Sequence, residues 1–480
     1  MEFAALLLLF PFLLAGLLYL GKKRRGDGVA AERRLPPAPR GLPVIGNLHQ
    51  VGALPHRALR ALAAAHDAPH LLRLRLGLVP ALVASSPAAA AELMRAQDHA
   101  FATRPYFRTA EILSYGFRDL VFAPHGEHWR HVRRLCSAHV LSAARSHRYN
   151  AMREREVSAL VKAVAAEASS SDSDTAVVDV SGALYRFAND VICRVVCGRV
   201  SREEEEGRSE LFRELIQENT ALLGGFCVGD YFPALAWADK LLSGGGARAW
   251  RNFRRWDGFN LTRDIVKSLL ADMFAAGTET TYVALEWAMS ELMKNPMTMR
   301  KLQNEVRSAA QSGGIARADT LGATATPYLK AVVKETLRLH PPVPLLLPRE
   351  CMQDATVMGY HVAKGTRVFV NAWAINRDPA SWHAPDEFLP DRFLESEVDF
   401  RGGHFQFISF GAGRRICPGM QFALTTVELA LANLVRMFEW ELPDGMVPGE
   451  LDMSDAPGLT TPRRVGLRLV ARPFEWDKQE

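Results

Sequence analysis

The chain has 480 residues, of which 48% are hydrophobic, and carries a formal net charge of +5. This length permits up to three domains or one large domain, and the composition is that of a protein with a buried core. The basic residues are scattered apart from one run near the N-terminus, and no nucleic-acid-binding motif occurs, so no nucleic-acid partner is predicted. Six cysteines without a CxxC pair argue against zinc ribbons, thioredoxin-type redox sites and a secreted disulfide scaffold.

The first 21 residues predict a membrane anchor. Residues 3–20 are almost wholly apolar, and as a helix they would span roughly 27 Å, close to the thickness of a bilayer core. Four basic residues follow at positions 22–25. A cleavable signal carries its positive charge before a shorter apolar run, so we interpret residues 1–21 as an uncleaved anchor with the rest of the chain in the cytosol. The alternative is a cleaved secretory signal, and the low cysteine usage argues against it.

Residues 22–46 are predicted to form a basic and proline-rich hinge. Four prolines between positions 36 and 43 make its second half stiff and extended. Such a segment can be a generic linker, but its place after an anchor favours a role in orienting a globular body against the membrane. Neither a repeat nor a second long linker follows, so residues 47–480 are predicted to form one domain.

The body of the chain is predicted to be mainly helical with small β-sheets. Strand-like patterns are confined to three short stretches, at residues 71–83, 356–370 and 465–470. One helix is exceptional, because residues 262–294 would form roughly 50 Å of uninterrupted helix. Thr262 can cap this helix, and Pro296 ends its pattern.

The middle of the long helix, residues 275–281, reads AAGTETT. Small residues there allow a bulky group to approach the helix backbone, whereas glycine followed by β-branched threonines is unfavourable for a helix. The alternative explanation is an ordinary tight crossing of two helices. The segment therefore indicates a special environment without deciding its nature.

Residues 410–419 read FGAGRRICPG and surround a single cysteine, Cys417. Three glycines permit tight turns, and Pro418 suits the first position of a following helix. A helix N-terminus and the neighbouring Arg414 and Arg415 are expected to lower the pKa of the Cys417 thiol and to favour the thiolate. A thiolate can attack a substrate, exchange disulfides or bind a metal. The remaining alternative is a structural buried cysteine.

This loop resembles that of the cytochrome P450 family. The family pattern F-x-x-G-x-R-x-C-x-G is matched at Phe410, Gly413, Arg415, Cys417 and Gly419. Further motifs occur in the family order, and the resemblance covers nearly the whole chain. These motifs are W-x-x-x-R at Trp129 and Arg133, A-G-x-[DE]-T at Ala276, Gly277, Glu279 and Thr280, E-x-x-R at Glu335 and Arg338, and a later arginine at Arg392. The segments at 101–105 and 122–135 are similar to the large plant A-type group.

The resemblance implies the cytochrome P450 fold, with haem b (iron protoporphyrin IX) between the long helix and the cysteine loop. Cys417 is then the metal ligand, and its thiolate pushes electron density that favours O–O cleavage. The resemblance assigns cofactor contacts to Ala276, Gly277, Phe410, Gly413 and Gly419, and propionate contacts to Trp129, Arg133, Arg349 and Arg415. It also makes Thr280 and Glu279 the catalytic pair that binds oxygen and relays protons, and Glu335, Arg338 and Arg392 a buried structural cluster.

The implied activity is an NADPH- and O₂-dependent monooxygenase at the endoplasmic reticulum membrane. Electrons would come from NADPH through NADPH–cytochrome P450 reductase. The expected substrate is a lipophilic small molecule, a plant specialised metabolite, because the stretches where relatives line their pocket are apolar. These positions are residues 343–347, Ile112, Leu113, Phe117 and Phe122; each could equally be ordinary core.

The chain departs from the family near Trp250. In relatives a few tens of residues separate the helix at this position from the long helix, whereas here residues 251–261 must make the connection. One alternative is therefore a haem-binding but inactive protein. Another is a haem-thiolate isomerase or dehydratase that needs neither O₂ nor a reductase. Such enzymes typically lack the oxygen-activating threonine, so Thr280 and Glu279 argue against it.

Overall fold

The computed structural model describes residues 34–169, 176–197, 202–239, 244–257, 264–310, 314–322 and 324–476. The anchor expected at residues 1–21, and the hinge before residue 34, lie outside these ranges. Within them, none of the helices combines the length and the apolar character that crossing a membrane would require.

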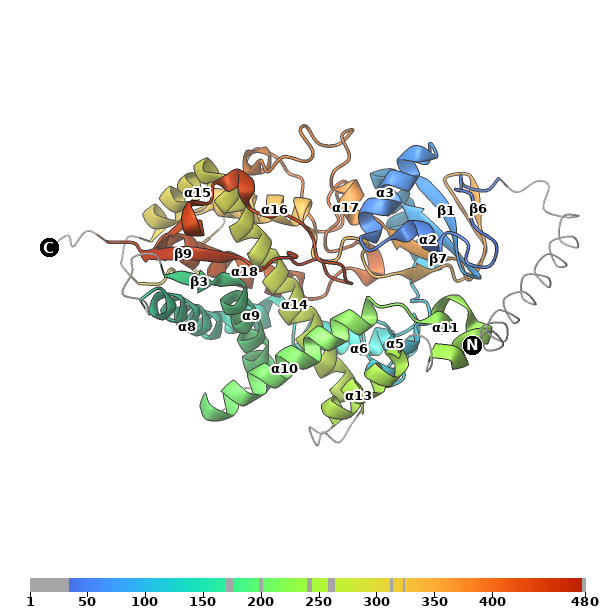
Figure 1. Cartoon of the computed structure of the whole chain (residues 1–480), viewed down its shortest axis with the longest axis horizontal. Coiled ribbons are helices and arrows are strands. Elements are labelled where there is room, and N and C mark those ends of the chain that lie inside the picture. Colours follow the sequence, from blue (N-terminus) through green and yellow to red (C-terminus); the bar gives the residue numbers. More distant parts are fainter. Residues whose placement is uncertain are drawn as a thin grey trace, which may run out of the picture.

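Helix α14 (Asp264–Lys294) runs through the middle of the molecule, between a β-rich end that carries β1 and β7 and an opposite end that carries β3 and β9 (Figure 1). Asp264 in its first turn and Lys294 in its last complement the helix dipole. Asn295 then leads into Pro296, the first residue of α15 (Pro296–Ala309). The predicted long helix is therefore present over residues 264–294, and residues 262 and 263 of the expected range lie outside the described residues.

The C-terminal half of α14 is buried on every side, as in helices at the centre of large domains. The helices that pack against it are α9 (Val180–Cys197), α10 (Arg202–Leu223), α16 (Pro327–Leu339) and α18 (Met420–Met437). Apolar side chains of α8, α9, α14, α16 and α18 merge into the largest hydrophobic cluster of the described residues. Because α14 is fixed on several sides, it is a rigid support for a site.

The described sheets are small, as predicted. The first has four strands in the order β1 (Leu71–Leu76), β2 (Val79–Ala84), β7 (Arg367–Val370) and β4 (Arg349–Glu350), with only the β2–β7 pair parallel. The second has three antiparallel strands in the order β3 (Val177–Asp179), β9 (Arg468–Pro473) and β8 (Phe438–Glu441). A hairpin joins β5 (Ala355–Val357) to β6 (Tyr360–Val362).

The remaining α-helices lie mainly around this centre. They are α2 (Leu48–Val51), α3 (Pro55–Ala65), α4 (Pro87–Ala91), α5 (Arg108–Leu113), α6 (Glu127–His139), α7 (Ala143–Arg148), α8 (Asn150–Ala168), α11 (Val228–Tyr231), α13 (Gly245–Asp257) and α17 (Ala372–Ile375).

Part of the connection expected at residues 251–261 is helical. Residues 251–257 belong to α13, and residues 258–263, which precede α14, lie outside the described ranges. Helix α13 extends this far because it is strongly amphipathic: Ala249 and Asn252 are buried, and its outer face is basic. Ion pairs with α10, from Arg248 to Glu218 and from Arg255 to Glu214, hold that face in place.

Candidate active site

The loop before α18 presents Cys417. The Cys417 amide donates to the Phe410 carbonyl at 3.0 Å, which closes the loop upon itself. Gly411 and Gly413 adopt positive φ angles of 71° and 68°, a backbone region that favours glycine. A Cβ atom on Gly413 would lie 2.2 Å from the Met94 carbonyl oxygen. Gly413 is therefore required where the loop passes against the neighbouring backbone.

The half-buried Cys417 sulfur accepts hydrogen bonds from the amides of Gly419 and Met420, at the N-terminus of α18. These amides and the charge of Arg133 favour the thiolate, but burial outweighs them and raises the pKa of the Cys417 thiol. The expectation of a lowered pKa is therefore wrong for the thiol without a metal. A coordinated metal would itself deprotonate the thiol.

The source of positive charge near Cys417 also differs from the expectation. Arg414 pairs with Asp98 at 2.9 Å, and the Arg415 guanidinium lies 4.1 Å from the centre of the Trp129 ring. Arg133 of α6 is the arginine that acts on Cys417, and its Nη2 donates to the carbonyl of Ile416 at 2.8 Å.

Several buried guanidinium groups gather beside the cysteine loop. Arg349 donates to Asp98 at 3.2 Å and to the Ala412 carbonyl at 2.9 Å. Arg415 donates to the carbonyls of Ala102 and Ala123 at 2.8 and 2.6 Å. Its third nitrogen, Nη1, is buried without a partner among the described residues. Burial first, then the charge of Arg349, lower the pKa of Arg415 to about 9.

The face of α14 toward this region is open. Ala276 is exposed and Thr280 is half-buried, although Phe274, Thr278 and Thr281 around them are buried. The two positions lie one helical turn apart on the same face. The Thr280 hydroxyl donates back to the Ala276 carbonyl at 2.6 Å.

Gly277 lies where α9 crosses α14. A Cβ atom there would lie 2.5 Å from Cδ1 of Ile192 in α9. The space beside Gly277 is thus filled by a side chain, and the glycine allows α9 to approach α14 closely. The contacts therefore support the tight helix crossing, and the cofactor contact of Gly277 stays a prediction.

Glu279 points away from Thr280, toward the C-terminal segment. Its Oε1 accepts from the Thr460 hydroxyl at 3.4 Å, and its Oε2 is buried without a partner in the described part of the chain. Burial raises the pKa of Glu279 to about 7, an effect that the Thr460 hydrogen bond opposes and the charge of Glu286 reinforces.

Glu335, Arg338 and Arg392 lie together. Arg338 makes a two-point ion pair with Glu335 at 2.7 and 2.9 Å, and neither side chain is exposed. Arg392 adds a contact to Glu335 at 3.1 Å. The remaining Arg338 donors bind backbone carbonyls, at Asn376, Pro385 and Glu387. This cluster joins α16 to the segment before the cysteine loop.

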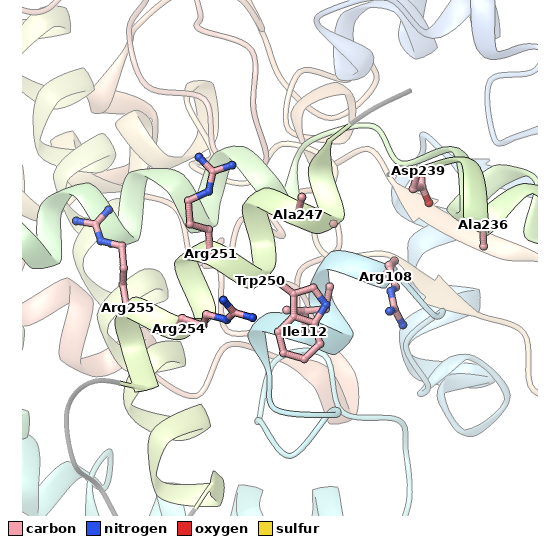
Figure 2. A pocket seen from close by; sticks show the side chains of 10 residues that line it. Arg108, Ile112, Ala236, Asp239, Ala247, Trp250, Arg251, Arg254 and Arg255 are labelled. Atoms are coloured by element: carbon pink, nitrogen blue, oxygen red, sulfur yellow. The ribbon is translucent and has the colours of Figure 1, made fainter. Parts of the chain in front are cut away.

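A separate pocket of ≈ 950 Å³ lies where α5 and α13 meet the 3₁₀ helix η3 (Pro233–Ala238). Ile112 and Trp250 lie next to each other at its centre, with Arg108 and Arg254 on either side (Figure 2). Of the residues expected to line a substrate pocket, Ile112 lines this pocket, and Ile112, Leu113 and Phe122 are all buried core residues.

Together these residues fit a haem. The loop offers one sulfur ligand at a helix N-terminus, and the face of α14 around Ala276 is open. Arg415 has one nitrogen without a partner among the described residues, and its charge repels those of Arg349 and Arg133. An anionic group such as a propionate would stabilise these guanidinium groups.

Comparison with known proteins agrees with this chemistry. The chain belongs to the cytochrome P450 family, whose family model matches residues 36–256 and 254–466. It is a haem-thiolate monooxygenase that takes electrons from a redox partner and acts on a small molecule with O₂. The fold matches a solved zebra fish cytochrome P450, described as a structure with abiraterone, with a TM-score of 0.70 and 24% identity over 88% of this chain and 100% of that one.

Curated plant relatives cover nearly the whole chain. This chain is 39% identical to a 3-beta-hydroxylase of Tanacetum parthenium, over 98% of each chain. It is 41% identical to (+)-menthofuran synthase of Mentha piperita, over 98% of this chain and 99% of the relative. An indole-2-monooxygenase of Zea mays is 40% identical, over 91% and 87%. These relatives favour monooxygenase activity over the inactive or isomerase alternatives.

The same comparisons point to missing length near α13. The family model matches in two parts that meet at residues 254–256. The alignment with the Tanacetum relative has 506 positions, so at least 26 of them are gaps in this 480-residue chain. The break in the family match falls within α13, next to the short connection that the sequence indicated.

Sequence reasoning missed Asp98, Asp119 and Asp272, which are partly or fully enclosed and bind backbone amides or arginines near the site. A usable signal existed only for Asp272, because it lies four residues before Ala276 and therefore on the same helical face.

Proposed function

We propose that Cys417 ligates haem b in an endoplasmic-reticulum monooxygenase that hydroxylates a lipophilic plant specialised metabolite. One observation carries the proposal: the only sulfur of the described loop at 410–419 lies at the N-terminus of α18 and accepts two backbone amides. In this arrangement Trp129, Arg133, Arg349 and Arg415 would hold the anionic propionate groups of the cofactor. The haem supplies the oxidation chemistry when bound.

The protein's contribution is to hold the substrate, exclude water and move protons. Ala276, with its small side chain on the open face of α14, leaves room for the reacting groups. The Thr280 hydroxyl can both donate and accept a hydrogen bond on that face. Glu279, with a pKa of about 7, is suited to taking and giving protons near neutral pH. Because its carboxyl group faces Thr460, a side-chain rotation or a bridging water must connect it to Thr280.

The redox partner is proposed to be NADPH–cytochrome P450 reductase, docked on α6. The outer face of this helix exposes Arg130, His131 and Arg134, while its inner side sends Arg133 to the cysteine loop. A basic face next to the ligand loop suits an acidic electron donor, because complementary charge accelerates encounter.

A membrane location is supported by apolar side chains exposed around η3. Phe226 and Trp237 are 52% and 66% exposed, and Leu78 in the β1–β2 turn is 50% exposed. The Leu78 amide donates to the Tyr231 carbonyl at 2.9 Å, and the Tyr231 ring stacks on Phe226, so these segments are neighbours. Together with the anchor at residues 1–21, this face would rest on the cytosolic surface of the membrane.

The substrate is proposed to be a lipophilic small molecule, in keeping with relatives named for indole and menthofuran chemistry. The domain boundaries are proposed as 1–21, 22–46 and 47–480.

The test is expression with a plant reductase in microsomes, followed by two measurements. A reduced-CO absorption band of the thiolate type, together with NADPH-dependent product from a plant metabolite extract, is the expected result. The band without turnover would favour the inactive alternative. Product formed from a hydroperoxide, without NADPH, would favour the isomerase or dehydratase.

A further inference from the structure

Two carboxyl groups from distant parts of the chain meet beside the open face of α14. Asp272 lies one turn before Ala276 and two turns before Thr280, on the same side of the helix. Its Oδ2 accepts from the amides of Leu120 and Val121, at 2.7 and 3.3 Å. Asp119, directly before these two residues, is 0% exposed.

The Asp119 side chain binds the backbone of the loop to which it belongs. Its Oδ2 accepts from the amide of Phe122 at 2.7 Å, whereas its Oδ1 is buried without a donor among the described residues. The Asp119 carboxyl lies within hydrogen-bonding reach of Asp272. Two ionised carboxylates offer only acceptors, so they would repel each other there; a single proton turns the contact into a strong O–H···O⁻ hydrogen bond.

We propose that Asp119 and Asp272 share one proton, and that this shared-proton pair positions the loop at residues 114–126 over the reactive face of α14. The proton resides on one carboxyl oxygen and is donated to the other carboxylate, so the pair carries one negative charge. The pair rests on the proposed function, because the face that it shapes is the one assigned there to the reacting groups.

The loop has no regular structure of its own and depends on side chains for its hydrogen bonds. Trp129 Nε1 donates to the Leu120 carbonyl at 3.2 Å, and Arg104 Nε donates to the Val121 carbonyl at 3.1 Å. Arg415 Nη2 donates to the Ala123 carbonyl at 2.6 Å. Among the described residues, the amides of Leu120, Val121 and Phe122 are bound only by the two aspartates. Losing the pair would leave buried amides unpaired, which is costly.

The loop also needs this support because its backbone is strained. Tyr115, Gly116 and Phe117 adopt positive φ angles of 55°, 76° and 59° in succession. Non-glycine residues in this region are destabilised and persist only where their surroundings hold them.

The charged surroundings are consistent with one retained proton. Burial raises the pKa of Asp119 to about 6, and burial with the nearby charge of Asp119 raises the pKa of Asp272 well above its ordinary value. Arg415, and Arg104 beside it, face Asp119 and favour one negative charge. Cys136 of α6 faces Asp272 and is itself neutral, because burial raises its pKa to about 11. The titration therefore belongs to the pair and not to either residue alone.

The test uses the full-length enzyme in microsomes and two azole probes. Clotrimazole is bulky and must fit beneath the loop, whereas imidazole is small and reports only access to the iron. In the wild type, clotrimazole affinity should fall roughly tenfold between about pH 6 and about pH 9, as the pair loses its remaining proton. Imidazole affinity, after allowance for its own protonation, should change little.

Asp119→Asn and Asp272→Asn should each remove this pH dependence, because the amide N–H replaces the shared proton at every pH. Asp272→Ala should weaken clotrimazole binding at all pH values. Asp264→Asn is the matched control, because Asp264 lies on the same helix and its exposed ion pair with Arg118 also reaches this loop. An exposed ion pair contributes little, so this variant should behave like the wild type and separate loss of the buried pair from loss of any loop contact. Hydrogen exchange of residues 119–123 gives a second reading that does not depend on haem, with protection retained in both Asn variants and lost in Asp272→Ala.

The proposal is overturned if the wild type shows no pH dependence, or if either Asn variant weakens clotrimazole binding and loop protection as much as Asp272→Ala. The latter result would mean that both charges are needed, as in a cation-binding site. Failure of the proposed function looks different: the thiolate-type CO band would then be missing from the wild type and from the Asp264→Asn control alike, while hydrogen exchange would still report on the pair.

Discussion

Arg338 and Glu335, one helical turn apart on α16, form an ion pair in which both side chains are completely buried. Every guanidinium nitrogen of Arg338 has an acceptor, either on Glu335 or on a backbone carbonyl. A buried charge is tolerated only when it is paired and hydrogen-bonded in this way. The pair therefore anchors three chain segments at one point.

Arg338→Ala should prevent recovery of folded, haem-loaded protein. The substitution leaves the Glu335 charge buried with only the contact from Arg392, and breaking a buried pair costs about 3–5 kcal/mol, a large part of the stability of a domain. Yield and haem content per milligram provide the measurement. Arg401→Ala, at an arginine whose side chain is 70% exposed, is the control and should be neutral. A normal haem content in Arg338→Ala would show that the pair is dispensable.

Cys417→Ala should abolish the reduced-CO band of thiolate-ligated haem, because the substitution removes the sulfur that accepts the amides of Gly419 and Met420. Cys193→Ala, at a half-buried cysteine of α9, should keep the band. Difference spectra of both variants in the same microsomal preparation provide the comparison. Persistence of the band in Cys417→Ala would refute the ligand assignment.

The motifs that could be predicted from the sequence are those whose partners are close along the chain. The loop at 410–419, the Glu335–Arg338 pair and the long helix depend on local spacing, and the small sheets depend on local alternation. The errors concern partners from other elements. Arg133, and not the adjacent arginines, supplies charge to Cys417, and Ile192 occupies the space beside Gly277. Such contacts depend on how the helices cross. No fixed spacing of residues in a single sequence predicts that crossing.

Glu279→Gln should stabilise the protein at alkaline pH and have little effect at acid pH. The pKa of Glu279 is raised by burial to about 7 in the folded protein, so the folded state holds this proton more tightly than the unfolded state. Its contribution to stability is present below the unfolded pKa of about 4.3 and is lost as the pH rises toward 7. The gain in Glu279→Gln at about pH 8 should be at most about 4 kcal/mol.

Thermal unfolding of the wild type and of Glu279→Gln at about pH 5 and about pH 8 measures this difference. Glu441→Gln, at a glutamate whose side chain is 51% exposed, is the control. An equal shift at both pH values would show that Glu279 has an ordinary pKa.

Removal of residues 1–25 should release much of the protein from the membrane. The apolar run is the main source of insertion energy, whereas the face with Phe226 and Trp237 gives only peripheral contact. The fraction of the protein that stays in the supernatant after membranes are sedimented, without a carbonate wash, measures its release from the membrane. Adding Trp237→Ser to the truncated protein should increase it further. In sealed microsomes the intact body should be digested by added protease; its protection would contradict a cytosolic orientation.

Thr280→Ala should leave haem binding and azole binding largely intact and yet uncouple NADPH consumption from product formation. Thr280 lies on the open face of α14, where its hydroxyl donates to the Ala276 carbonyl at 2.6 Å. That hydroxyl has a lone pair left to accept a proton from water and can switch its own proton toward a reacting oxygen. Alanine keeps the helix, because it has the highest helix propensity, but it removes this step. Protons then arrive by less ordered routes, and more of the oxygen leaves as hydrogen peroxide.

Thr280→Ser retains the hydroxyl and should preserve most of the coupling. The measured quantities are NADPH consumed, peroxide released and product formed in the three proteins. Unchanged product per NADPH in Thr280→Ala would remove Thr280 from the proton path and leave the assignment of Cys417 untouched.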